Sequence, residues 1–194
     1  MVATHPIQRP YTADDLAGMP EDGRRYEVIG GELLVSPSPT TRHQRISGRL
    51  YRRIETYVED QDIGVAYAAA FDVHLGEHDI VQPDILVVLK ANVSRLREVG
   101  MAGPPDLVIE IISPSSSGID RIRKAATYAT FGVPEYWIVD PDSETILAQA
   151  LEGGRFRPVP SEDGPIRSVQ IAGLVIDPAE VFAVPDWMPR PNAR

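Results

Sequence analysis

Two runs of Val, Ile and Leu near the middle of the chain are each interrupted by an acidic residue. The first run, at 82–89, contains Asp84, and the second, at 105–112, contains Glu110. Continuous runs of β-branched residues of this length are typical of buried strands. A carboxylate inside a buried strand is costly unless a partner compensates its charge. A hard divalent cation is one such partner, and two strand carboxylates with one metal ion and a nearby lysine can cleave phosphodiester bonds.

The composition is that of an ordinary globular protein. The 194 residues are 43% hydrophobic and 24% charged, which is enough apolar material for one domain with its own core. We expect a single domain over residues 1–194, with a core at about 11–182 and a loose, proline-rich tail at 185–194. No run approaches the roughly 18 apolar residues that span a membrane. The first residues have no apolar signal segment, so we expect no membrane contact and a cytoplasmic location.

Cysteine content and charge restrict the chemistry further. Without cysteine the chain has neither disulfides nor thiolate metal sites. The formal net charge of -9 argues against broad nonspecific attraction to DNA. One basic segment nevertheless contains no acid, and its arginines are Arg42, Arg45, Arg49, Arg52 and Arg53. They either face the phosphates of a nucleic acid or form the exposed side of a helix, and both interpretations stay open.

Hydrophobic periodicity and turn residues predict an α/β protein in which helices flank a mixed sheet. Gly30-Gly31 predicts a tight N-terminal hairpin between strands at 25–29 and 32–35. One face of that hairpin would carry Glu27, Ile29, Glu32 and Leu34. Helices are predicted at 12–19, 41–60 and 119–131, with a short helix or loop at 91–101. The remaining strands are predicted at 65–75, around Asp84, around Glu110, and at 135–139, 145–151 and 155–159, before a small closing element at 171–184.

Several motifs of the chain are similar to those of one known family. They are found at 25–32, His43, 82–84, 104–115, Asp120, Lys124, Tyr128 and 132–141. As a set, over about 11–182, they resemble a bacterial family described as putative restriction endonucleases, within the PD-(D/E)XK nuclease superfamily. The resemblance implies a restriction-endonuclease-like fold in which Asp84 and Glu110 bind Mg²⁺, with Mn²⁺ as a substitute. It also implies a lysine that assists the attacking water.

One position departs from the superfamily pattern. Strand alternation puts residue 112 on the same face as Glu110, where the pattern has lysine, but this chain has Ile112. The resemblance implies that Lys124, on the following helix, supplies the cation instead. The helical wheel opposes this role, because it separates two stripes: Ile119, Ile122, Ala126 and Ala129, and nearly opposite them Asp120, Lys124 and Tyr128. If only the Ile/Ala stripe meets the sheet, Lys124 points to water and pairs with Asp120 at the surface.

Three further residues are candidates for the site. Glu27 or Glu32 could complete the metal site, although both could equally be solvated carboxylates at a sheet edge. His43, at the start of a helix, could contact the substrate or could cap and pack the helix. Other acids are expected at turns or have only a strand position in their favour: Asp72, Asp106 and Asp140.

Together these expectations describe a Mg²⁺-dependent nuclease that hydrolyses phosphodiester bonds in nucleic acid. The resemblance leads us to expect an endonuclease that acts on DNA as a homodimer. The residues themselves do not distinguish DNA from RNA as the substrate. The alternative is a catalytically inactive homodimeric binding or scaffold module on the same fold, with Ile112 as the first sign of decay. The chain lacks the glycine-rich phosphate-binding motifs, so no nucleotide cofactor is expected.

Overall fold

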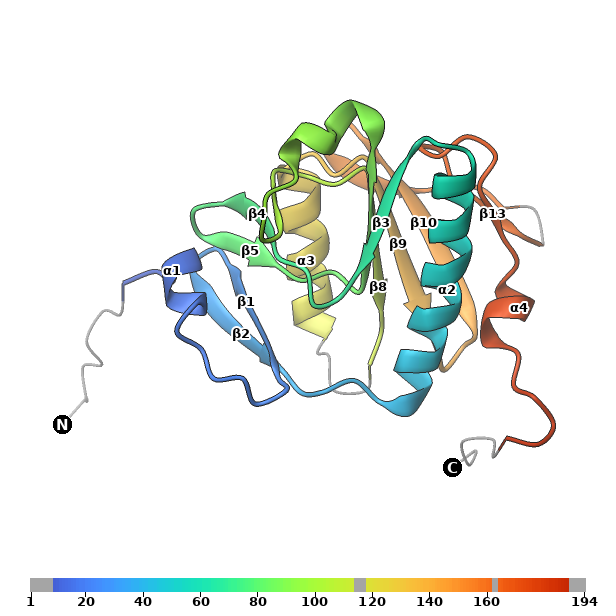
Figure 1. Ribbon diagram of the computed structural model, residues 1–194, viewed down its shortest axis with the longest axis horizontal. Coiled ribbons are helices and arrows are strands. Elements are labelled where there is room, and N and C mark those ends of the chain that lie inside the picture. The colour runs from blue at the N-terminus through green and yellow to red at the C-terminus, as the bar shows by residue number, and fades with distance from the viewer. Residues whose placement is uncertain (1–8, 114–117, 162–163, 189–194) are drawn as a thin grey trace.

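The centre of the protein is a six-stranded mixed sheet with the strand order β11-β10-β9-β8-β6-β3 (Figure 1). Its strands are β3 (Gly64–Ala68), β6 (Ile85–Leu89), β8 (Leu107–Ile111), β9 (Glu135–Asp140), β10 (Thr145–Glu152) and β11 (Arg155–Pro158). β8 and β9 are parallel, and the other neighbouring strands are antiparallel. The computed structural model describes residues 9–113, 118–161 and 164–188, without the side chains of residues 119 and 120.

A second sheet of five strands has the order β2-β1-β5-β4-β7. Its strands are β1 (Arg25–Ile29), β2 (Glu32–Ser36), β4 (Val73–Gly76), β5 (Asp79–Val81) and β7 (Met101–Ala102). The predicted hairpin is confirmed, because Gly30 and Gly31 have the positive φ angles, 58° and 77°, that a tight two-residue turn requires. The shared face is confirmed as well, since the Cα partners across the hairpin are Glu27 with Leu34 and Ile29 with Glu32.

Helix α2 (Thr41–Asp60) covers one face of the six-stranded sheet, at the predicted residues. Its N-cap, Thr40, accepts a hydrogen bond of 3.2 Å from the amide of His43. The predicted apolar stripe is buried against the sheet, and it consists of Ile46, Leu50, Ile54 and Val58. The strands β12 (Ile166–Arg167) and β13 (Val175–Ile176) and the helix α4 (Pro178–Phe182) contribute to the same core.

Helix α3 (Gly118–Thr130) and the five-stranded sheet pack over the opposite face, in a second core. The helical wheel gave the wrong orientation for this helix. Tyr128 is fully buried, whereas Ile122 is 71% exposed. The stripe with Lys124 and Tyr128 faces the sheet, because the sheet presents Glu110 at that place and hydrogen-bonding side chains can compensate its charge.

The predicted strand at 65–75 is wrong, because the chain passes from one sheet to the other within it. β3 ends at Ala68 in the six-stranded sheet, and β4 begins at Val73 in the five-stranded sheet. The chain returns at residues 82–84, between β5 and β6. Asp84 therefore lies where the backbone joins the two sheets.

The remaining predictions differ from the structure mainly at element ends. Helix α1 (Ala13–Leu16) is shorter than predicted, and the segment after β6 forms the 3-10 helix η1 (Lys90–Arg95). Part of the tail that was expected to be loose, 189–194, lies outside the described residues, as does 114–117. Among the described residues, no helix combines the length and the hydropathy needed to cross a membrane.

Candidate active site

Asp84 precedes β6 by one residue, so it lies just outside the strand predicted around it, and it faces Glu110 of the neighbouring strand β8. In the antiparallel β6–β8 pair Ile85 is the partner of Ile109, so the register continued by one residue sets Asp84 against Glu110. The amide of Ile111 donates a hydrogen bond of 2.7 Å to Oδ2 of Asp84. Leu86, two residues after Asp84, and Val108, two residues before Glu110, belong to the core beneath α3. Both carboxylates therefore face α3 as well.

Three donors surround the carboxylate of Asp84, which is only 2% exposed. Besides the Ile111 amide, Arg25 Nη2 donates to Oδ1 at 2.7 Å, and His43 Nε2 lies 3.1 Å from Oδ2. Burial alone would raise the pKa of Asp84, but the hydrogen bond with His43 and the charge of Arg25 hold it well below its ordinary value. Asp84 is therefore ionised at neutral pH.

Glu110, near the end of β8, contacts two side chains of α3. Lys124 Nζ lies 3.0 Å from Oε1, and the hydroxyl of Tyr128 donates to the same oxygen at 2.7 Å. The lysine side chain is 12% exposed, so it does not point to water as the helical wheel suggested. The alternative partner considered for Lys124 was Asp120, whose side chain lies outside the described residues.

Glu27 of β1 reaches the same lysine from the other sheet. Its Oε1 lies 2.8 Å from Lys124 Nζ and accepts a hydrogen bond of 2.8 Å from the amide of Gln82. Glu27 is 1% exposed. Glu32 is on the same hairpin face but pairs with Arg123 at the surface, where the Glu32 side chain is 64% exposed. Of the two candidate hairpin acids, only Glu27 joins the buried cluster.

The cluster holds three carboxylates but two permanent cations, Arg25 and Lys124. Burial alone would lower the pKa of Lys124, but the charges of Glu110 and Glu27 raise it, so the lysine remains an ammonium ion. Burial raises the pKa of Glu110, and the charges of Asp84 and Glu27 act in the same direction against that of Lys124. One negative charge in excess remains, and it favours a cation or a proton at Glu110.

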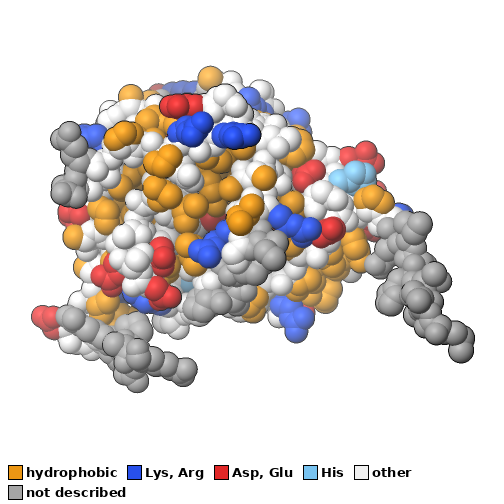
Figure 2. Space-filling view, turned by 180° about the vertical axis from the view of Figure 1, so that it is seen from behind, with side chains coloured by type: hydrophobic (Ala, Val, Ile, Leu, Met, Phe, Trp, Pro, Cys, Tyr) orange, Lys and Arg blue, Asp and Glu red, His pale blue; other side chains and the backbone are white. Residues whose placement is uncertain are grey.

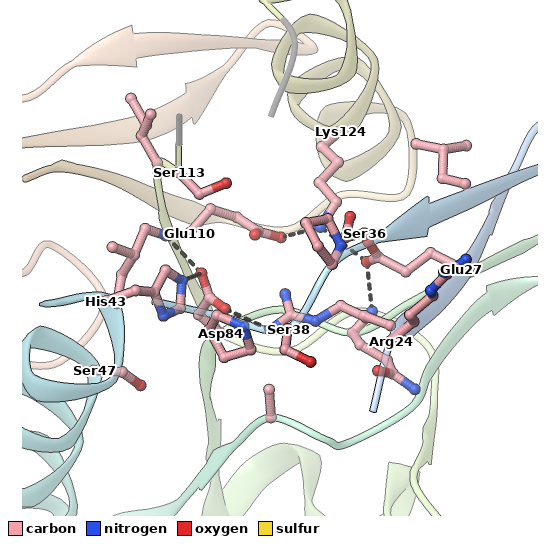
Figure 3. Close-up of a pocket in the computed structure, with 18 of the residues that line it drawn as sticks. Arg24, Glu27, Ser36, Ser38, His43, Ser47, Asp84, Glu110, Ser113 and Lys124 are labelled. Carbon is pink, nitrogen blue, oxygen red and sulfur yellow. Dashed lines mark hydrogen bonds and ion pairs between the residues drawn. The ribbon is translucent and has the colours of Figure 1, made fainter. Parts of the chain in front are cut away.

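Except for Tyr128, the clustered side chains line one cavity of about 590 Å³. Figure 3 shows Asp84, Glu110, Lys124 and Glu27 converging on its interior from the two sheets and α3. Ile112, at the position where the superfamily pattern has lysine, lines the same cavity. The described lining of the cavity thus contains one lysine, Lys124, which comes from the helix α3 instead of the strand.

The donor set suits a hard cation held by two carboxylates. Each carboxylate oxygen has two lone pairs. Oδ2 of Asp84 and Oε1 of Glu110 each contact two donors, whereas Oδ1 of Asp84 contacts Arg25 alone. Among the described residues no donor contacts Oε2 of Glu110. Mg²⁺ prefers oxygen ligands and keeps several waters, so Oδ1 and Oε2 are its candidate ligands here. Within the described ranges, no three His, Asp or Glu side chains are grouped so that they could hold one ion.

The arginines of α2 mostly contact the C-terminal part of the chain. Arg49 donates to the carbonyls of Glu180 at 2.9 Å and Val181 at 3.2 Å. Arg45 also donates to a backbone carbonyl, while Arg53 and Arg42 pair with acidic side chains. These contacts favour the structural interpretation of the basic segment over a phosphate-facing surface. On the face seen in Figure 2, Lys and Arg side chains form separate spots among hydrophobic and acidic ones.

The remaining acidic candidates have structural partners. Asp106 accepts a hydrogen bond of 2.7 Å from the amide of Leu89, which holds the start of β8 against the end of β6. Asp140 accepts from the amide two residues ahead, as expected of a turn residue. Asp72 accepts from the side chain of Gln82 and is absent from the described residues that line the cavity.

Two members of the cluster were not among the residues predicted from the sequence, Arg25 and Tyr128. Arg25 is two residues before Glu27, and alternation along a strand puts both on one face, which could have identified it as a counter-cation. Tyr128 follows Lys124 by four residues, and such pairs lie on one helix face. His43 was predicted as a candidate, and the structure brings it to Asp84.

The chain matches one protein family in sequence and one solved structure in fold. The sequence model of the Uma2 family, described as "putative restriction endonuclease", matches residues 13–179. Among solved structures, the chain resembles a putative nuclease belonging to DUF820 from Anabaena variabilis ATCC 29413, with a TM-score of 0.74 and 24% identity. The match covers 89% of this chain and 98% of that chain, and at this identity it concerns the fold, whose predicted class it confirms. No curated protein matches the chain.

Proposed function

Because the chain belongs to the Uma2 family of putative restriction endonucleases, as its motifs suggested, we propose that it is a Mg²⁺-dependent endonuclease that hydrolyses phosphodiester bonds in DNA. The observation that supports this most is the position of the lysine. Lys124 Nζ lies 3.0 Å from Glu110, which stands opposite Asp84 at the edge of one open cavity. Two carboxylates that can hold a metal ion, with an ammonium ion in the same cavity, are groups that can serve metal-assisted hydrolysis of a phosphodiester.

Asp84 and Glu110 would hold the cation through the oxygens that retain lone pairs. When bound, Mg²⁺ polarises a phosphate oxygen and lowers the pKa of a bound water. The protein keeps Asp84 ionised for this purpose through Arg25 and His43. The backbone carbonyl near Ile111 is a further candidate ligand, since it follows Glu110 directly at the end of β8.

Lys124 would act as a fixed positive charge. The raised pKa keeps its amine protonated, so it does not serve as a general base at neutral pH. An ammonium ion can instead orient the attacking water or stabilise the negative charge that develops on the phosphoryl oxygens. Glu27 and Glu110 fix its position from two sides, which lowers the cost of reorganisation during the reaction.

The test is cleavage of supercoiled plasmid and of single-stranded DNA and RNA by the purified protein with Mg²⁺, Mn²⁺ or EDTA. We expect metal-dependent nicking or linearisation of the plasmid. The control variants are Asp84→Asn and Glu110→Gln, which keep the shape of each side chain but remove its charge, and both should be inactive.

A protein that is folded and binds nucleic acid, yet cleaves none of these substrates with either metal, would be the inactive binding module instead. Cleavage only from the ends of linear DNA would replace the endonuclease assignment by an exonuclease. Light scattering of the same preparations tests the expected homodimer.

A further inference from the structure

We propose that Arg25 is a phosphate-binding residue whose guanidinium occupies Asp84 until a divalent cation displaces it. This inference rests on the proposed function and adds to it a residue that exchanges partners. Before the cation binds, Arg25 compensates the charge of Asp84. Afterwards it is free to bind the scissile or a neighbouring phosphate of the substrate.

The two oxygens of Asp84 differ in how accessible they are to a metal ion. Oδ2 lies 2.7 Å from the amide nitrogen of Ile111 and 3.1 Å from His43 Nε2, so both of its lone pairs are engaged. The backbone donor cannot move without distorting β8. A cation must therefore approach Oδ1, and this is the oxygen that Arg25 Nη2 contacts at 2.7 Å.

A divalent ion at Oδ1 of Asp84 would also repel Arg25. A divalent ion at Oδ1 would bring two positive charges next to the guanidinium, and like charges at such distances repel strongly in a partly buried site. The same ion would compensate Asp84, which then no longer attracts Arg25. Both effects favour a movement of Arg25 away from Asp84 when the metal binds.

The cavity beside Arg25 gives its side chain a second place to bind. Its side chain is 19% exposed and lines the cavity that also holds Glu110 and Lys124. Within the described residues, Nη2 is the one nitrogen of this guanidinium with a side-chain partner, Asp84. The remaining N–H groups form a planar fork that matches two oxygens of a phosphate. A substrate phosphate in the cavity is therefore a suitable second partner.

The metal half of the proposal is tested by calorimetric titration of the metal-free full chain with Mn²⁺. Arg25→Gln should bind Mn²⁺ about tenfold more tightly than the wild type, because a competing charge has been removed. The matched control is Arg97→Gln, which removes the same charge from an exposed side chain that is absent from the described lining of the cavity. This control should change the affinity by less than about threefold. Equal affinities of Arg25→Gln and Arg97→Gln would overturn the proposal.

The phosphate half is tested by fluorescence anisotropy with a short DNA duplex, in the presence of Ca²⁺ or EDTA. We expect Ca²⁺ to strengthen DNA binding by the wild type and this gain to fall about tenfold in Arg25→Gln, the scale of one charge-assisted contact. The slope of log Kobs against log salt should also fall by about 0.9 when one phosphate contact is lost. A full Ca²⁺-dependent gain in Arg25→Gln would refute phosphate binding.

A third variant keeps the test decisive if Arg25→Gln does not fold. Arg25→Lys retains the charge, so its Mn²⁺ affinity should stay close to that of the wild type, while the lost fork should weaken Ca²⁺-dependent DNA binding by at least about threefold. Undiminished DNA binding by this variant would count against the proposal. If the wild type cleaves DNA with Mg²⁺ but these variants show no effect, the inference fails and the nuclease assignment stands. If the wild type binds no metal, both fail.

Discussion

The ammonium nitrogen of Lys124 lies 2.8 Å from Oε1 of Glu27, a carboxylate that belongs to the other sheet. Because Lys124 also contacts Glu110, one side chain of α3 connects the β1–β2 hairpin to the edge of β8. The position of this lysine thus depends on three elements that are far apart in the sequence.

Replacing Lys124 tests whether this charge serves turnover. Lys124→Met should lower kcat by about 10²–10³, the scale for one preorganised charge, and change KM little. The free energy of unfolding should fall by about 3–5 kcal/mol, because two buried carboxylates lose their cation. Arg123→Met is the control, since Arg123 pairs with Glu32 at the surface and should contribute less than about 1 kcal/mol. Full activity of Lys124→Met would remove this residue from the mechanism.

Moving the ammonium group from α3 to the end of β8 tests whether the element that carries it matters. Ile112 lines the same cavity and directly follows β8. The double variant Ile112→Lys/Lys124→Met should therefore recover part of the activity lost in Lys124→Met, measured as kcat on the same plasmid. The single variant Ile112→Lys shows how much the extra charge alone changes turnover. No recovery in a folded double variant would mean that the ammonium must approach from α3.

Metal binding should be visible in thermal stability. A ligand that binds only the native state stabilises it by about 2.7 kcal/mol at a concentration one hundred times its Kd. Mn²⁺ or Mg²⁺ should accordingly raise the Tm of the wild type relative to EDTA, and the double variant Asp84→Asn/Glu110→Gln should lose this response. An unchanged shift in the double variant would locate the ion elsewhere.

The raised pKa of Glu110 predicts a particular pH dependence of stability. A carboxyl group whose pKa is raised on folding binds its proton more tightly in the native state, so its contribution is present in acid and is lost as pH rises through the raised pKa. Glu110→Gln lacks this titration. In metal-free buffer the variant should therefore gain stability relative to the wild type as pH rises above the ordinary pKa of glutamate, as measured by urea denaturation.

Asp84→Asn is the control for this pH series. The pKa of Asp84 is lowered on folding, so its contribution is present above its ordinary pKa and disappears only in strong acid. Asp84→Asn should thus be less stable than the wild type by a constant amount over the same range. A constant difference for Glu110→Gln as well would show that Glu110 is fully ionised throughout.

Arg49 separates stability from nucleic-acid binding on α2. Arg49→Ala removes hydrogen bonds to the carbonyls of Glu180 and Val181 and should cost about 1–3 kcal/mol. DNA affinity measured by anisotropy should not change, because these donors face the protein. Arg52, exposed on the same helix, is the control, and Arg52→Ala should change stability by less than about 0.5 kcal/mol. A loss of DNA affinity in Arg49→Ala without a loss of stability would restore the phosphate interpretation.

Much of the fold could be predicted because its signals are local. The glycine pair at 30–31 specifies its own turn, and the apolar stripe of α2 repeats over 20 residues. The break near Ala68 could not be predicted, because apolar residues continue into the next strand while the chain changes sheets. Hydrophobic alternation records burial, and both sheets bury their strands against the same core.

Part of the site could also be predicted from local signals in the sequence. Asp84 and Glu110 are conspicuous because each interrupts an apolar run, and adjacent strands bring them together. The helical wheel gave the wrong orientation for α3, because a hydrophobicity pattern assumes an apolar surface beneath the helix. The surface beneath α3 carries Glu110 instead. Arg25 is 59 residues from Asp84, and its contact depends on how the hairpin packs. No local pattern contains that information.

The passage of the backbone from one sheet to the other at residues 82–84 has a consequence for motion. Any relative opening of the two sheets stretches the contact between Asp84 and Arg25. If a cation at Asp84 displaces Arg25, this contact is lost and the opening costs less, and by reciprocity a looser hairpin favours the cation. The binding of a cation in the cavity and the extent to which the β1–β2 hairpin opens are thus coupled, and either one reports on the other.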